Sequence, residues 1–313
     1  MAAQERGFYY HFLSMNNGKR VWGCELSSVD TTIFMCGALH AGEYFKGTDV
    51  EEIANELYER IDWRWMLNGR DILCMGWNPE DGFLSYYWDI YNESPFIYAL
   101  AIGSPTHPID SSSWDAFKRP VGRYGSYSFI YCFTGSLFIN QYSHAWIDFR
   151  NIKDRYANYW DNSVKATMAN RQYCIDNANK HKGYGEDCWG LTACLGPNGY
   201  QGYGGGVPGK TIDDGTIAPC AAAGSIPFAP KECIGALRYM YVNYGTRVYG
   251  PCGFYDGFNI DENWFSKETL GIDQGITLLM IENYRSQGVW KYFMRLPAIK
   301  KWLSLCMKSD IKK

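Results

Sequence analysis

The stretch YNESPFIYALAIGS (residues 91–104) predicts where one helix of this chain begins. Pro95 suits the first helical position, where no N–H donor is needed, and Ser94 suits the N-cap before it. Glu93 precedes the predicted cap and satisfies no obvious helix donor. This stretch therefore predicts a helix that starts beside an acidic side chain.

Segments on both sides of this stretch also have helical patterns. Ser27, followed by Asp30 three residues later, is typical of a capping box before a helix at residues 29–45. In residues 50–68, apolar side chains recur every four positions. Further helices are predicted at residues 137–150, at 162–179, after Pro230, and at 273–295, with a short one after Pro297.

The loops between these segments are rich in Gly, Asn, Asp and aromatic residues. Residues 72–83 suggest a small hairpin, and the Gly-rich residues 183–215 are predicted as loops. Since convincing alternating strands are few, the pattern favours an all-α domain. A toroid of paired helices would gather helix N-termini, loops and acids at one rim, but periodicity also fits an irregular bundle.

The aromatic content is unusual, at 17% of the residues with 12 Trp and 25 Tyr. These side chains combine a flat apolar face with a polar edge, which suits the C–H faces and hydroxyl rims of sugars. An aromatic-rich core is the alternative explanation. The formal net charge of −3 offers no basic field for nucleic acid.

The chain contains no run of about 18 apolar residues, so we expect no membrane-spanning helix. The first residues lack the pattern of a signal peptide. The 11 Cys are scattered without a C-x-x-C pair, so zinc-ligand spacing is absent and buried thiols are expected. We expect a cytoplasmic protein, with a periplasmic protein whose leader was removed as the alternative.

Four acids stand near predicted helix starts or in aromatic, Gly-rich loops: Asp30, Glu93, Glu186 and Asp273. Glycoside hydrolysis needs two carboxyl groups, one protonated and one ionised. Aromatic surroundings raise the pKa of a carboxyl group, which suits the proton donor. Both Glu93 and Glu186 have aromatic neighbours in the sequence.

Structural roles are also open to these acids. Asp30 can cap its helix, and Asp273 can be an acid favoured by a helix N-terminus. Glu186 can be an exposed loop residue. In the segment 137–150, Gln141, His144 and Asp148 fall on one helical face and could line a cleft, although a histidine in such a helix is commonly a satisfied core group.

Long motifs throughout the chain resemble the bacterial glucoamylase-like (glycoamylase) domain family, which includes endo-β-1,2-glucanases. They run in family order and cover nearly the whole chain: GFYYHFL, ELSSVDTT, YFKGTDVEEIANELYERIDWRWMLNG, MGWNPEDGFL, WDIYNESPFIYALAIGSPTHP, NQYSHAWIDFR, GYGEDCWGLTACLGP, DDGTIAPCAAAGSIPFAP and LGIDQGITLLMIENYRSQGVWKYFMR.

The resemblance implies a single (α/α)6 toroid over residues 1–313 with a central active-site cleft. It implies Glu93 and Glu186 as the leading catalytic candidates, with Asp30 and Asp273 near the same cleft. The chemistry that the resemblance implies requires no metal or organic cofactor. Residues expected to bind the sugar are Trp77, Trp88, Asp89, Tyr91, Gln141, His144, Trp189 and Asp214.

The implied activity is hydrolysis of a β-linked glucan, foremost β-1,2-glucan or its oligosaccharides. We expect Glu93 to be the general acid while a second acid activates water, which inverts the anomer; retention through Glu93 and Glu186 is the rival. A transglycosylase and a non-catalytic glucan-binding protein are the alternatives. The expected partner is the glucan alone, without nucleic acid or membrane, and the expected state is a monomer or small homo-oligomer.

Overall fold

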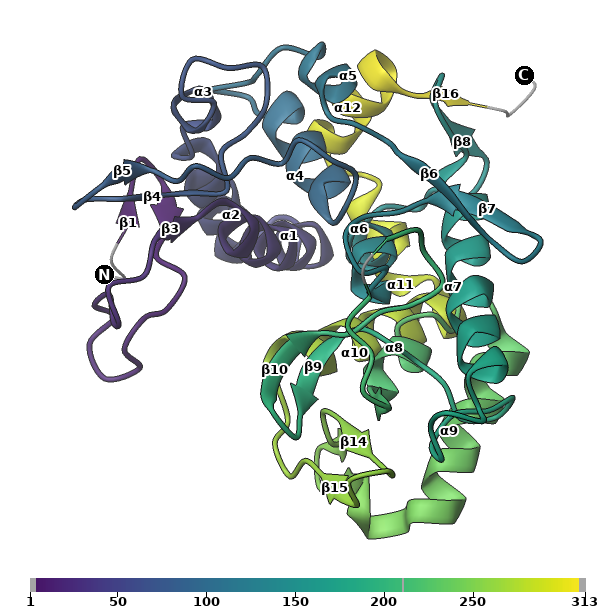
Figure 1. The fold of residues 1–313 in the computed structure, drawn as a ribbon. Coiled ribbons are helices and arrows are strands. Elements are labelled where there is room, and N and C mark those ends of the chain that lie inside the picture. The colour runs from purple at the N-terminus through teal and green to yellow at the C-terminus, as the bar shows by residue number, and fades with distance from the viewer. Residues whose placement is uncertain (1–3, 210, 310–313) are drawn as a thin grey trace. The chain divides into compact units, whose positions relative to one another are not determined.

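The computed structural model describes residues 4–209 and 211–309, which form two compact units (Figure 1). The first unit takes in the chain up to Lys118, the segment Asn151–Arg155 and the chain from Val289 onward. The second unit takes in Arg119–Arg150 and Tyr156–Gly288. Each unit therefore combines segments that are distant in sequence, and the single domain over residues 1–313 stays a prediction.

Helices form the framework of the first unit. The longest, α1 (Ser28–Tyr44), packs along α2 (Asp49–Glu59) and contacts α4 (Ser94–Gly103). Every residue of α4 is buried, as expected of a helix that is apolar on all sides. The other helices here are α3 (Trp63–Met66), α5 (Ser113–Ala116), α11 (Gly288–Phe293) and α12 (Pro297–Cys306).

Helix α4 packs closely against α12, and Gly103 makes this contact possible. A Cβ atom at this position would collide with the backbone of Ala298. Close packing at its C-terminal end holds α4 in place, and therefore also holds Glu93 at the opposite end of the same helix.

The predicted caps are largely confirmed. The Ser27 Oγ accepts a hydrogen bond from the Asp30 N–H at 3.2 Å and caps α1. Helix α4 begins one residue earlier than predicted, with Glu93 at the N-cap and Pro95 in the first turn. The Asn92 Oδ1 accepts a bond from the Ser94 N–H at 2.8 Å, which explains the earlier start.

The helix predicted at residues 50–68 is interrupted. Helix α2 ends at Glu59 and α3 begins at Trp63. Asp62 lies between them, and its Oδ1 accepts a bond from the Trp65 N–H at 3.0 Å. This side chain starts a new helix, so one continuous helix was a wrong prediction here.

The helix predicted at residues 137–150 is also wrong in its extent. A 3-10 turn at Leu137–Asn140 leads into α6 (Tyr142–Trp146), and Asp148 lies beyond the helix. The Asp148 Oδ1 accepts bonds from the Arg150 backbone N–H at 3.1 Å and from its guanidinium at 2.8 Å. This local pairing competes with helix continuation, so Asp148 does not join Gln141 and His144 on one face.

Helices also build the second unit, around α7 (Tyr159–Asp176), which confirms the helix predicted from residue 162. Helix α8 (Pro219–Ala223) packs against α9 (Pro230–Tyr244) and α10 (Gly271–Ser286). Gln287, with a left-handed φ of 59°, ends α10 and divides the helix predicted at residues 273–295. Within the described part of the chain, none of the helices combines the length and apolar character needed to span a bilayer.

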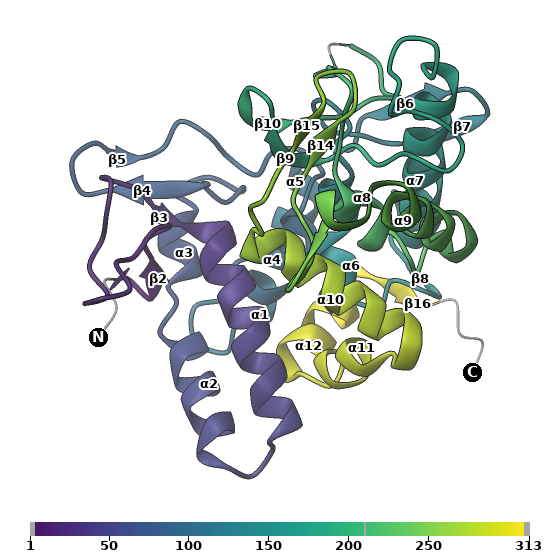
Figure 2. The same cartoon turned by 90° about the horizontal axis from the view of Figure 1, so that it is seen from below.

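Short antiparallel strands supplement the helices, so the all-α prediction holds for the framework but misses these pairs (Figures 1 and 2). The predicted hairpin is confirmed as β4 (Gly76–Asn78) and β5 (Gly82–Phe83), with β3 (Leu26–Ser27) beside β4. The other pairings within the first unit are β1 (Gln4–Glu5) with β2 (Phe8–Tyr9), and β8 (Ile152–Lys153) with β16 (Lys308–Ser309).

The predicted Gly-rich loop contains one of the hairpins of the second unit, β9 (Ala193–Gly196) with β10 (Gly199–Gly202). A three-stranded sheet joins β11 (Thr216–Ile217), β14 (Phe258–Asn259) and β15 (Trp264–Phe265). The remaining pairs are β6 (Val121–Tyr124) with β7 (Tyr127–Ile130), and β12 (Tyr249–Gly250) with β13 (Gly253–Phe254).

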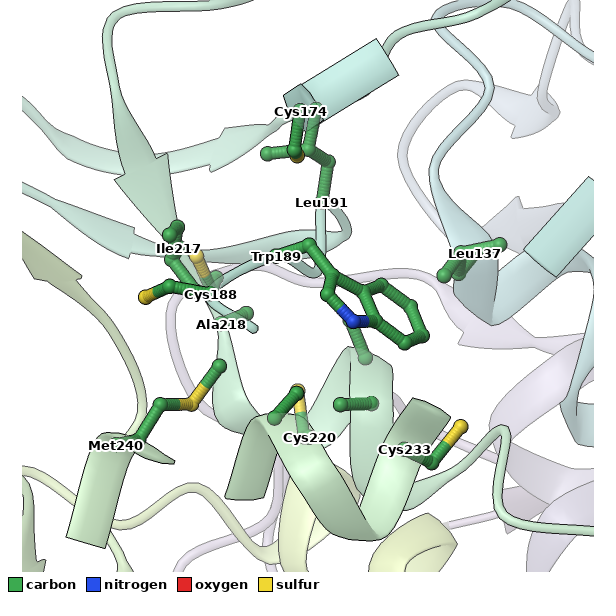
Figure 3. Packing of buried hydrophobic residues seen from close by; sticks show 14 of the residues in the cluster. Leu137, Cys174, Cys188, Trp189, Leu191, Ile217, Ala218, Cys220, Cys233 and Met240 are labelled. Carbon is green, nitrogen blue, oxygen red and sulfur yellow. The ribbon is translucent and has the colours of Figure 1, made fainter. Parts of the chain in front are cut away.

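Aromatic, aliphatic and sulfur-containing side chains form the core of the second unit. In Figure 3, Trp189 lies among Leu191, Ile217 and several cysteines. Of the 11 cysteines, all but Cys252 and Cys306 are buried. The predicted buried thiols are therefore confirmed, and they fill space in the core as small apolar groups.

Candidate active site

Glu93 occupies the N-cap of α4 in the first unit, and its side chain keeps part of its surface accessible. Burial raises its pKa to about 7, and the charge of Asp30 contributes to the rise. Burial disfavours the charged carboxylate, and a nearby negative charge disfavours it further. Glu93 can therefore hold a proton near neutral pH, as a general acid must.

Asp30 lies in the first turn of α1 and is half-buried. The Ser27 hydroxyl donates a hydrogen bond to its Oδ2 at 2.5 Å, and the His11 Nε2 lies 3.6 Å from the same oxygen. The other ring nitrogen of His11 lies 2.9 Å from the Glu25 Oε1. The first unit thus brings Asp30 and Glu93 close enough for their charges to interact.

The predicted sugar-binding residues around Glu93 differ in exposure. Trp88 and Tyr91 are 5% and 1% exposed, so neither ring offers a face to a ligand in this structure. The Trp88 Nε1 instead donates to the Ser28 Oγ at 2.8 Å and ties this loop to α1. Trp77 and Asp89 keep accessible surface and are the two of these four that a sugar could contact directly.

The second unit contains a pair of buried acids. Asp273 lies in the first turn of α10, and Asp256 lies between β13 and β14. They are 6% and 1% exposed, and each carboxyl group affects the pKa of the other. Burial is the main cause that raises the pKa of Asp273 to about 8, and Asp256 adds to it.

A small cavity of about 10 Å³ adjoins these two acids. That volume is roughly what a single water molecule needs. Its lining combines both carboxyl groups with neighbouring polar and sulfur side chains: Cys220, Tyr255, Gln274 and Thr277, beside Pro219, Ala223 and Phe254. The acid pair can therefore border on one bound water.

Glu186 has a different environment. Its side chain is 78% exposed, and its Oε1 lies 3.1 Å from an Arg171 guanidinium nitrogen. Glu186 thus lies at the solvent-exposed surface beside a cation and not in an apolar pocket. Glu186 therefore lacks the surroundings of a general acid in this structure.

The remaining predicted sugar-binding residues lie in the second unit, and three of them are buried. Trp189 is fully buried in the core, while Gln141 and His144 are each 1% exposed. The Gln141 amide donates to the Ala221 carbonyl at 2.8 Å, and the His144 Nε2 lies 2.9 Å from the Ser163 hydroxyl. These three side chains support the fold rather than an accessible sugar surface.

Burial keeps His144 neutral, because it lowers the pKa of the imidazole to about 3. Asp214 is partly exposed, and its Oδ2 accepts a bond from the Tyr203 hydroxyl at 3.2 Å. Asp214 thus remains available to a ligand, whereas His144 fits the core role that was its alternative.

The sequence reasoning missed Asp256. Its segment, GFYDGFN (residues 253–259), carries aromatic and glycine neighbours like those around Glu93 and Glu186. That signal could have placed Asp256 among the candidate acids. Its pairing with Asp273 could not be predicted, because it depends on how β14 and α10 pack.

The Glycoamylase family model, described as “Putative glucoamylase”, matches residues 85–297. An exo β-1,2-glucooligosaccharide sophorohydrolase (non-reducing end) from Parabacteroides distasonis is 32% identical, over 94% of this chain and 46% of that protein. The chain thus spans about half the length of this curated relative.

Solved structures are similar over nearly the whole chain. The endo-β-1,2-glucanase from Chitinophaga pinensis, in complex with sophorotriose and glucose, has a TM-score of 0.92 and 32% identity, covering 98% of this chain and 78% of that chain. A β-1,2-glucanase from Parabacteroides distasonis has a TM-score of 0.90 and 29% identity, covering 97% and 49%. With the family model matching well over half of its length, the chain belongs to the Glycoamylase family.

Proposed function

We propose that this protein hydrolyses a β-linked glucan, foremost β-1,2-glucan or its oligosaccharides, by carboxyl acid and base catalysis. The proposal depends on one observation above all. At the N-cap of α4, burial raises the pKa of Glu93 to about 7. The relatives named for β-1,2-glucan cleavage supply the linkage. The proposed architecture is one (α/α)6 toroid with the substrate cleft at its centre.

Glu93 is the proposed general acid. It donates its proton to the glycosidic oxygen as the bond from that oxygen to the anomeric carbon breaks. A second carboxyl group, acting as the base, takes a proton from a water molecule. The water oxygen forms the new bond to the anomeric carbon on the opposite face of the sugar. The product anomer is therefore inverted relative to the substrate.

Asp273 is the best-supported second acid. It is buried and borders a cavity of the size of a single water. Asp30 acts instead on Glu93, because its charge helps to keep Glu93 protonated. The retaining mechanism with Glu186 has less support, since Glu186 is exposed and paired with Arg171.

The substrate is tested by product analysis on a panel of glucans with defined β-1,2, β-1,3, β-1,4 and β-1,6 linkages. We expect the purified protein to cleave β-1,2-glucan and to leave the other linkages intact. Products longer than the starting oligosaccharide would identify a transglycosylase. Binding of β-1,2-glucan without cleavage would identify a glucan-binding protein and refute the proposed hydrolysis.

We predict that kcat/KM falls as the pH rises through about 7. A general acid is active in its protonated form, and Glu93, with its pKa of about 7, loses its proton in that range. Asp30→Asn should move this alkaline limb to lower pH, because it removes a negative charge that raises the pKa of Glu93. A limb that keeps its position in Asp30→Asn would contradict the assignment.

We predict that Glu186→Gln leaves kcat within about a factor of two, because Glu186 is neither the acid nor the base of the proposed inverting reaction. The side chain is 78% exposed, and an exposed ion pair with Arg171 contributes little. Steady-state kinetics on β-1,2-glucan oligosaccharides measure this. A loss of about a hundredfold or more would instead favour retention with Glu186 as the nucleophile.

A further inference from the structure

The buried carboxyl groups of Asp256 and Asp273 each use one oxygen for a neighbouring donor. The Asp256 Oδ2 accepts a hydrogen bond from the Leu195 N–H at 2.5 Å. The Asp273 Oδ1 accepts one from the Cys220 thiol at 3.3 Å. Within residues 4–209 and 211–309, the other two oxygens, the Asp256 Oδ1 and the Asp273 Oδ2, are buried and have no hydrogen-bond partner.

These two remaining oxygens can be satisfied by one proton. Ionised carboxylates only accept hydrogen bonds, so a hydrogen bond that satisfies both oxygens requires a proton on one of the two side chains. Two carboxyl groups that line one small buried cavity also cannot both ionise easily, because their charges would repel. The pair therefore holds one proton and one negative charge.

We infer that Asp256 is a positioning residue that shares one proton with Asp273, so that the two carboxyl groups act together as a single base. This inference rests on the proposed function, in which Asp273 activates the water. Asp256 does not touch the substrate. It acts through Asp273 by taking over the shared proton.

The shared proton resolves a difficulty in the proposed reaction. Burial alone raises the pKa of Asp273, so a lone Asp273 would favour its protonated form and could accept nothing from water. The pair keeps one negative charge, so it can take the proton as the water oxygen bonds to the anomeric carbon. Glu93 meanwhile gives its proton to the leaving oxygen. The pair then returns one proton to solvent, and Glu93 regains one.

Three titratable groups around the pair stay neutral near pH 8. Cys220 of α8, Cys194 of β9 and Tyr200 of β10 all have a pKa raised by burial, and the charges of the pair raise each pKa further. The Lys267 ammonium lies 4.6 Å from the ring centroid of Tyr255, the residue before Asp256. This ammonium donates hydrogen bonds to the Thr246 and Arg247 carbonyls. Asp214 acts on the same Cys194 thiol.

Asp256→Asn is a suitable test because asparagine preserves the shape of the site. Its amide oxygen can accept from the Leu195 N–H, and its amide nitrogen can donate to the Asp273 Oδ2. The variant thus removes only the shared proton. Asp273→Asn gives the reciprocal test, and Asp261→Asn, at a carboxylate bound by His181 and the Lys182 N–H, is the matched control.

Carboxyl ¹³C NMR of protein labelled at aspartate measures the titration without substrate. In the wild type and in Asp261→Asn, we expect one aspartate resonance to titrate near pH 8. In both Asp256→Asn and Asp273→Asn this alkaline step should be absent. Persistence of the step in either variant, or its absence from the wild type, would overturn the shared proton.

Kinetics complete the test. We expect Asp256→Asn to lower kcat about tenfold with KM unchanged, because a less basic Asp273 is a weaker general base. An unchanged kcat would overturn the positioning role. If the NMR titration is as expected but the wild type cleaves no glucan, the proposed function fails and the shared proton stands. If glucan is cleaved without the alkaline step, the reverse holds.

Discussion

Glu93→Gln should lower kcat on β-1,2-glucan oligosaccharides by about 10²–10⁴-fold, the usual contribution of a general acid. Glutamine keeps the size of the side chain but cannot give a proton to the leaving oxygen. The alkaline limb near pH 7 should disappear with it, because Glu93 sets that limb. Steady-state kinetics across pH measure both effects, and calorimetry should find glucan binding retained.

A substrate whose leaving group departs without a proton separates acid catalysis from misfolding. Glu93→Gln should cleave a β-sophoroside of a nitrophenol at a rate much closer to the wild type. Glu80→Gln makes the same chemical change in an exposed ion pair with Arg20 and should have wild-type kinetics on both substrates. An equal loss by Glu93→Gln on both substrates would contradict the general-acid role.

Asp273→Asn should also lower kcat by about 10²–10⁴-fold, because the water loses the base that takes its proton. The loss should exceed that of Asp256→Asn, since Asp256 acts only through Asp273. KM should change little. Kinetics of the two variants on one oligosaccharide, compared with Asp261→Asn, measure the difference.

Azide provides the control for this second prediction. It is a nucleophile that needs no base, so it should restore turnover to Asp273→Asn and release a glycosyl azide. It should not restore turnover to Glu93→Gln on a natural glucan, where the leaving group still needs a proton. Rescue of Glu93→Gln but not of Asp273→Asn would exchange the two roles.

Local sequence signals predicted the helix starts well, because each depends on residues within one turn. Ser27 and Pro95 mark the starts of α1 and α4 to within one residue. The strands were mostly missed, since strands of two residues such as β3 and β11 are too short to show an alternating pattern. The interruptions at Asp62 and Asp148 come from side chains that bond to the nearby backbone, which apolar periodicity does not register.

The candidate site was predictable where residue type and local sequence decide the environment. Glu93 beside an apolar helix is one example, and its raised pKa agrees with that reasoning. Burial decided the other cases. Trp189 packs in the core and Glu186 is exposed, although both stand in the same Gly-flanked segment. The Asp256–Asp273 pair joins residues from different elements, so only the tertiary structure reveals it.

Time-resolved ¹H NMR of β-1,2-glucan cleavage by the wild-type protein tests the central claim most directly. It follows the loss of the β-1,2 linkage and the anomer of the first reducing ends, before they equilibrate in water. The account predicts cleavage with α anomers formed first, as inversion by Glu93 and the acid pair requires. An uncleaved glucan, or β anomers formed first, would contradict it.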